Sequence, residues 1–98
     1  MNTANLQLEG LYAAFAAMMT AIRERGLLDA GEIDRALAVA EEKIVNDPGR
    51  PTKLSAANVE AICFPLRYLR LANEASARGE DLSFTQLAQN VGRMKPDR

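Results

Sequence analysis

Few side chains in this sequence could carry chemistry. The 98 residues include no histidine, so the usual general base and the commonest metal ligand are both missing. Cys63 is the only cysteine and the only obvious nucleophile, and no imidazole can activate it. On a helix it shares a face with Val59 and Leu66, so we expect a buried structural thiol.

A group of carboxylates lies between residues 32 and 42. Helix-borne carboxylate metal sites usually recruit histidine and point into a bundle. These side chains are instead expected to point outward, on the solvated side of an amphipathic helix. The run GRPTK at 49–53 lacks the glycine framework that cradles a phosphate. We therefore expect no metal, no cofactor and no enzyme activity. The carboxylates are Glu32, Asp34, Glu41 and Glu42.

The segment 83–92, SFTQLAQNVG, resembles the first helix and turn of a bacterial helix-turn-helix, in which L-A-x-x-x-G is common. This resemblance implies a DNA-associated transcriptional regulator. It departs from the pattern where bases would be read, because only RMKPDR follows Gly92 and no recognition helix can form there. A degenerate helix-turn-helix-like regulator is therefore the alternative interpretation.

The basic residues give this alternative little support. The formal net charge is −1, so the chain as a whole has no electrostatic reason to seek nucleic acid. Glu74 lies at i+7 from Arg67 and at i−4 from Arg78, which favours a self-neutralised surface over a basic patch. The cationic side chains concerned are Arg67, Arg70, Arg78, Arg93, Lys95 and Arg98.

The elements that position these residues are expected to be helices only. Alanine is abundant and tryptophan absent, which favours helices over strands. The first helix should start at an N-cap on Thr3 or Asn5 and end before Gly26, which suits a left-handed C′ position. Asp29 with Glu32 forms a capping box that starts the second helix and closes an antiparallel hairpin.

Two more helices follow the breaker run at 46–54. Ser55 should cap a long third helix that ends at Gly79. Pro65 lies inside that helix, so we expect a kink or break near Cys63–Phe64. Ser83 with Gln86 should cap a short helix that ends near Gly92. The sequence predicts one domain over 1–98, with 1–5 and 93–98 flexible.

The run 8–22 carries two apolar faces, and this is its most informative property. A bulky face, which should suffice for the protein's own core, comprises Leu8, Leu11, Phe15, Met18, Met19 and Ile22. A small-residue face, suited to close helix approach, comprises Gly10, Ala14, Ala17 and Ala21.

The third helix is two-faced as well, and the short fourth helix can cover only one surplus face. The simplest cover for the other is a second copy of the chain. We therefore expect a non-catalytic interaction or regulatory protein that acts as a homodimer, with an unidentified protein partner left open. The predicted interface consists of Gly10, Ala14, Ala17 and Ala21 with Phe64 and Tyr68 as aromatic anchors.

Cytoplasmic location is the expectation from the remaining features. A single cysteine cannot form an internal disulfide, which fits a reducing compartment. The apolar run is shorter than the roughly 20 residues that a membrane span requires, so no membrane association is expected.

Overall fold

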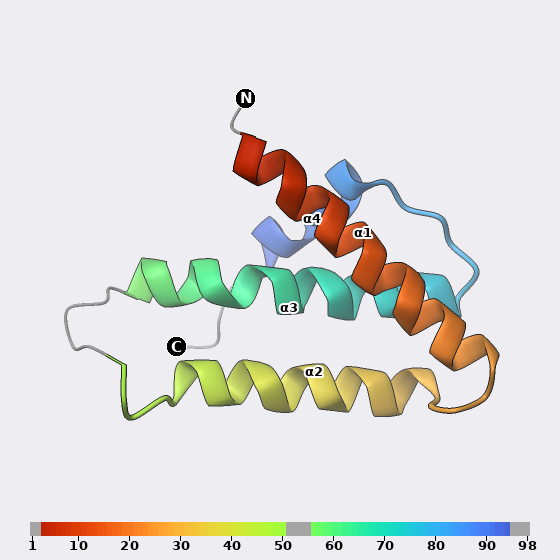
Figure 1. Ribbon diagram of the computed structural model, residues 1–98, viewed down its shortest axis with the longest axis horizontal. Coiled ribbons are helices and arrows are strands. Elements are labelled where there is room, and N and C mark those ends of the chain that lie inside the picture. The colour runs from red at the N-terminus through yellow and green to blue at the C-terminus, as the bar shows by residue number, and fades with distance from the viewer. Residues whose placement is uncertain (1–2, 51–55, 95–98) are drawn as a thin grey trace.

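The computed structural model describes residues 3–50 and 56–94. They form four helices: α1 (Thr3–Glu24), α2 (Ala30–Val45), α3 (Ala56–Ala77) and α4 (Phe84–Arg93). The predicted all-α, four-helix domain is therefore confirmed (Figure 1). No helix within the described ranges is long and apolar enough to cross a membrane.

The turn between α1 and α2 forms as its residues predict. Gly26 has a φ of +74°, and its N–H donates to the Arg23 carbonyl at 3.0 Å. The Leu27 N–H reaches back to the Ile22 carbonyl, which completes a Schellman motif. At the start of α2, the Asp29 carboxylate accepts from the Glu32 N–H while the Glu32 side chain accepts from the Asp29 N–H.

The end of α3 and the start of α4 follow the same rules. Gly79 has a φ of +76° and closes a second Schellman motif, in which the Glu80 N–H donates to the Ala75 carbonyl at 2.9 Å. Ser83 and Gln86 form the predicted capping box. α4 continues to Arg93, one residue beyond Gly92.

One expectation about helix boundaries is wrong. α1 is already helical at Thr3, so neither Thr3 nor Asn5 is its N-cap. The alanine and leucine residues there continue a helix well, and they outweigh the capping preference of the polar residues. α3 passes through Pro65 without a break, whereas a kink at that residue stays a prediction. The predicted cap at Ser55 and the residues 95–98 lie outside the described ranges.

α3 is the central helix, because α1, α2 and α4 each pack against it. In Figure 1, α2 runs alongside α3, while α1 crosses α3 at an angle and its N-terminal half diverges from α2. The predicted two-faced character of α3 is thus used within the chain, and six of its residues are buried. The main core cluster comprises Tyr68, Leu69, Ala72, Leu87 and Val91.

Candidate functional site

α1 contributes partly covered side chains to the core but no buried residue. Tyr12, Ala16 and Met19 face the core cluster. The side chains next to them around the helix are left in solvent, at exposed fractions of 45%, 51%, 49% and 61% for Leu8, Leu11, Phe15 and Met18. The expectation that the bulky face fills the protein's own core is therefore wrong. α1 is rotated so that the Tyr12 side meets α3, and most of the bulky face lies at the edge of that contact.

The small-residue face is also open to solvent. Gly10, Ala14, Ala17 and Ala21 are all exposed, and a Cβ added at Gly10 would meet no atom within 4 Å. This face lies about half a turn around α1 from Tyr12, and its Ala17 and Ala21 line an open groove between α1 and α3. Two different apolar faces of α1 are consequently uncovered.

Phe64 and Tyr68, the predicted interface anchors, lie elsewhere. Tyr68 is only 4% exposed and packs in an aromatic cluster, with ring centroids 5.0 Å from Tyr12 and 5.3 Å from Phe84. Phe64 is half-buried, and its ring centroid is 6.3 Å from that of Tyr12. The structure therefore brings the two anchors together inside the chain, against the opposite side of α1 from the small-residue face.

Burial changes the chemistry of the phenols in this cluster. Desolvation raises the pKa of Tyr68 first of all, and the charge of Glu9 raises it further. Burial likewise raises the pKa of Tyr12. Both groups are therefore held in their neutral form, which suits a core role.

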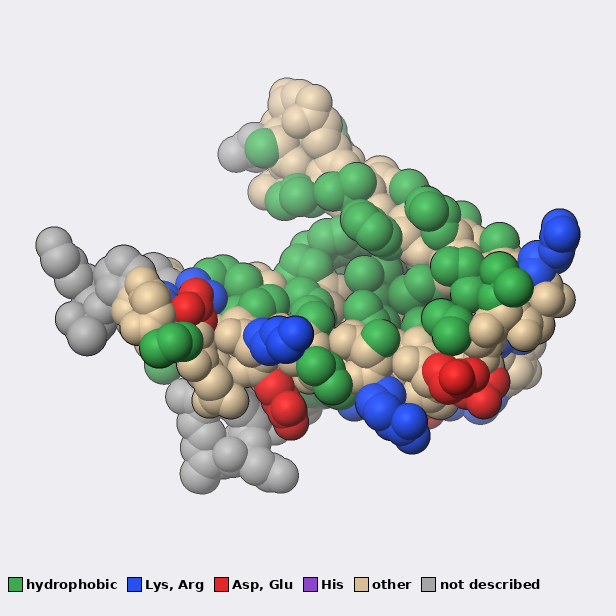
Figure 2. All heavy atoms as spheres, turned by 60° about the horizontal axis from the view of Figure 1, so that its bottom comes forward, with side chains coloured by type: hydrophobic (Ala, Val, Ile, Leu, Met, Phe, Trp, Pro, Cys, Tyr) green, Lys and Arg blue, Asp and Glu red, His purple; other side chains and the backbone are tan. Residues whose placement is uncertain are grey.

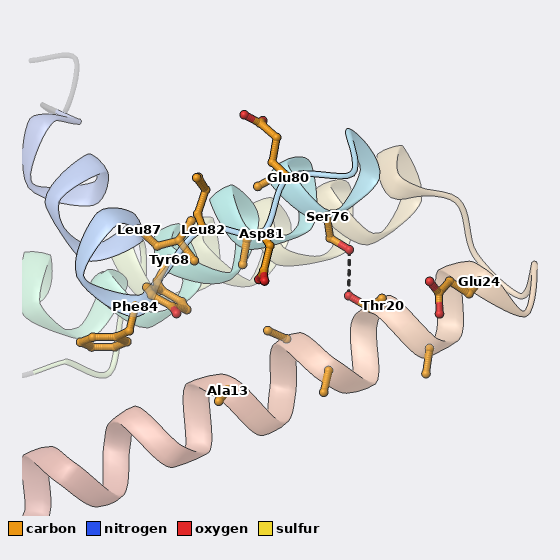
Figure 3. A pocket seen from close by; sticks show the side chains of 15 residues that line it. Ala13, Thr20, Glu24, Tyr68, Ser76, Glu80, Asp81, Leu82, Phe84 and Leu87 are labelled. Atoms are coloured by element: carbon orange, nitrogen blue, oxygen red, sulfur yellow. Dashed lines mark hydrogen bonds between the residues drawn. The ribbon is translucent and has the colours of Figure 1, made fainter.

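A groove of about 560 Å³ lies between α1 and the α3–α4 segment (Figure 3). Its α1 wall consists largely of alanine methyl groups, including those of Ala17 and Ala21. A hydrogen bond of 3.0 Å between the hydroxyls of Thr20 and Ser76 crosses it. Glu24, Glu80 and Asp81 also line the groove. Arg23 Nη2 also donates to the Ser76 hydroxyl at 3.1 Å, so both hydroxyls are engaged within the chain.

Cys63 is fully buried, with 0% of its surface exposed, as predicted. Desolvation is the largest cause that raises the pKa of its thiol, and the nearby Arg67 guanidinium lowers it only in part. The thiolate is the reactive form of cysteine, so this environment disfavours nucleophilic chemistry.

An ion-pair network joins α2 to α3, and the sequence analysis missed it. Arg67 Nε donates to Glu41 at 2.9 Å and Nη1 to Glu60 at 2.5 Å. Arg70 donates to Asp34 through Nε at 2.9 Å and lies 3.5 Å from Glu41. The carboxylate hydrogen bonds outweigh desolvation and raise the pKa values of Arg67 and Arg70.

This network corrects two expectations. Asp34 and Glu41 do not point into solvent with Glu32 and Glu42, because they lie on the flank of α2 that faces α3. Arg67 pairs with Glu41 and Glu60 and not with Glu74, whereas the Arg78–Glu74 pair forms as expected at 2.5 Å. A signal was present: Arg67 and Arg70 are three residues apart and Asp34 and Glu41 seven, so each pair shares a helix face.

Among residues 3–50 and 56–94, no cluster of three or more acidic or cysteine side chains is arranged to hold a metal ion. Asp34 and Glu41 are instead engaged by arginine. No protein family, curated protein or solved structure matches this chain.

Proposed function

We propose that this chain is a non-catalytic helical interaction protein that acts as a homodimer. The observation that carries the proposal is α1, a 22-residue, largely apolar helix in which no residue is buried. A long helix in a compact domain normally buries one apolar stripe. A second copy is the simplest partner, because a two-fold contact needs only one self-complementary surface.

The side chains with chemical potential support a non-catalytic role. Cys63 is sealed in the interior with a raised pKa. The Thr20 and Ser76 hydroxyls bond each other, and the sequence offers no histidine to activate either one. The single cysteine also fits a cytoplasmic location, which belongs to the same proposal.

A DNA-associated regulator is the alternative function, supported by the helix-turn-helix-like run in α4. The basic residues of α3 weigh against it, since Arg67, Arg70 and Arg78 each donate to carboxylates. A salt-dependent shift of duplex DNA at about micromolar protein would favour the regulator. The absence of such a shift would contradict the alternative function.

The homodimer is tested by the mass of the protein in solution. Sedimentation equilibrium over a range of concentrations should give twice the chain mass of 10.7 kDa at the upper end. A mass of one chain at about 100 µM would contradict the proposal, because a contact weaker than that is typical of transient encounters.

A further inference from the structure

We infer that two copies of this chain pair through a heptad stripe on α1, formed by Leu8, Leu11, Phe15, Met18 and Ile22. This inference rests on the proposed homodimer and names its contact. It moves the contact away from the small-residue face of Gly10, Ala14, Ala17 and Ala21.

The spacing of the heptad stripe is that of a helix–helix seam. Its members are separated by three, four, three and four residues, as the a and d positions of a coiled coil are. Such a stripe stays on one side of a helix over two heptads, so a second helix can pack along its whole length. Large apolar side chains at these positions supply the knobs of knobs-into-holes packing.

The positions that flank the stripe indicate which partner fits. In coiled coils, charges at the e and g positions select the partner and its direction. Here those positions carry no charge. Gln7, Ala14 and Ala21 flank the stripe on its open side, and Tyr12 and Met19 flank it on the side that packs on the core cluster. Two copies of the stripe can thus meet without like-charge repulsion, and nothing in the flanks selects a differently charged partner.

The stripe and the small-residue face differ in how much apolar area a dimer contact would bury. The small-residue face and four members of the stripe are exposed in the single chain, whereas Ile22 is half-buried. The leucine, phenylalanine and methionine side chains of the stripe would remove far more apolar area from water than alanine or glycine do. Figure 2 shows hydrophobic side chains gathered around the hollow between the N-terminal part of α1 and the rest of the molecule. A helix laid along the heptad stripe would take the larger share of the apolar surface out of water.

The chain exposes enough surface area for such a contact. The accessible surface is 6924 Å², whereas a compact monomer of this mass exposes about 5,500 Å². The excess of about 1,400 Å² is larger than the roughly 800 Å² that each partner buries in a stable interface. Leu8, Leu11, Phe15 and Met18 contribute to the exposed surface, because 45–61% of each is exposed.

The test compares two glutamate substitutions on opposite sides of α1. Phe15→Glu places a charge in the middle of the heptad stripe, and two such carboxylates would be desolvated and unpaired in the dimer. We expect its dimer dissociation constant, measured by sedimentation, to rise by about 100-fold or more. The matched control, Ala17→Glu, carries the same charge on the small-residue face and should change the dissociation constant by less than about threefold.

Folding of the variants is checked independently by circular dichroism. Both positions are exposed, so each variant should keep the helix content of the wild type. Met18→Lys gives a second, oppositely charged disruption of the stripe should Phe15→Glu fail to fold. A wild type that is monomeric removes the homodimer and the stripe together. A dimer that resists Phe15→Glu and Met18→Lys, or that Ala17→Glu dissociates as strongly, leaves the homodimer standing and overturns the stripe.

Discussion

The thiol of Cys63 gives a direct measure of how closed the interior is. It has no exposed surface, and burial raises its pKa. We expect it to react with a thiol reagent such as DTNB at least about 100-fold more slowly in the native protein than in the unfolded chain. Labelling in buffer and in concentrated urea gives the two rates. Native labelling at the unfolded rate would show that the interior around Cys63 opens readily and would reopen the question of a reactive site.

Tyr68 predicts a loss of stability at alkaline pH. Its pKa is raised in the folded state above the ordinary value of about 10, so the folded protein holds the phenolic proton more tightly than the unfolded chain does. This contribution is fully present below about pH 10 and declines as the pH rises from there through the folded pKa.

Urea unfolding of the wild type and Tyr68→Phe measures this effect. Phe keeps the ring in the aromatic cluster and removes only the ionisable group. The difference in unfolding free energy between the two proteins should stay constant below about pH 9 and shift in favour of Tyr68→Phe above about pH 10. A difference that does not change with pH would mean that the phenol titrates alike in the folded and unfolded states.

For single residues, the sequence predicts burial better than it predicts which side chain a residue will contact. Burial of Cys63 follows from its helix face, which depends only on local spacing. The ion-pair partners of Arg67 cannot be predicted from local spacing, because a long flexible side chain can reach several carboxylates. Which one it meets depends on how α2 is rotated against α3, and that rotation is set by packing over the whole helix pair.

The contact between α2 and α3 depends on its ion pairs as well as on its apolar residues. The side chains of Arg67 and Glu41 are only 11% and 16% exposed. Breaking a largely buried pair leaves a charge poorly solvated, so Arg67→Leu should lower the unfolding free energy by about 2–3 kcal/mol. Urea denaturation gives the value.

A double variant tells the ion pair apart from lost packing. Arg67→Leu combined with Glu41→Leu removes both charges and should be more stable than Arg67→Leu alone. Arg78→Leu is the matched control, because it breaks an exposed pair and should change stability little. If the double variant were no more stable than Arg67→Leu, the charge of Glu41 would not be the cause of the loss.

Pro65 provides a test of the shape of α3. Its ring removes the backbone hydrogen bond to the Ala61 carbonyl, although the helix continues past it. Pro65→Ala restores a donor there and should leave the fold intact with a straighter α3 and undiminished stability. Circular dichroism and urea unfolding provide the readout. Unfolding of the variant would mean that a bend at Pro65 is required by the packing of α3.

The helix ends with capping boxes were predictable at the scale of elements, whereas the start of α1 was not and helix orientation was predictable only in part. The Asp29–Glu32 and Ser83–Gln86 capping boxes rely on residues three apart, so their chemistry can be read locally. α1 is apolar on two sides, and either side could face a core. Its orientation is decided by the aromatic contact of Tyr12 with Tyr68, a residue 56 positions along the chain, which no local pattern reveals.

The whole molecule is flatter and more open than its length requires. Its radius of gyration is 14.2 Å, against about 13 Å for a compact domain of this length. Its dimensions are 42 × 32 × 22 Å. Three helices share α3 as their support, and α1 crosses α3 (Figure 1) with the side chains of Leu11, Phe15 and Met18 left exposed. A second copy along α1 would thicken the assembly and complete a bundle on that side.

Stability should therefore depend on protein concentration. If folding and association are linked, unfolding a dimer yields two free chains, and mass action favours the folded state as the concentration rises. With the enthalpy typical of two chains of this length, a hundredfold increase in concentration should raise Tm by about 7 °C. Scanning calorimetry or circular dichroism melts at the two concentrations measure the shift. Phe15→Glu should melt at a lower temperature that does not change with concentration. A wild-type Tm that also does not change with concentration would mean that self-association through the exposed side of α1 does not stabilise this fold.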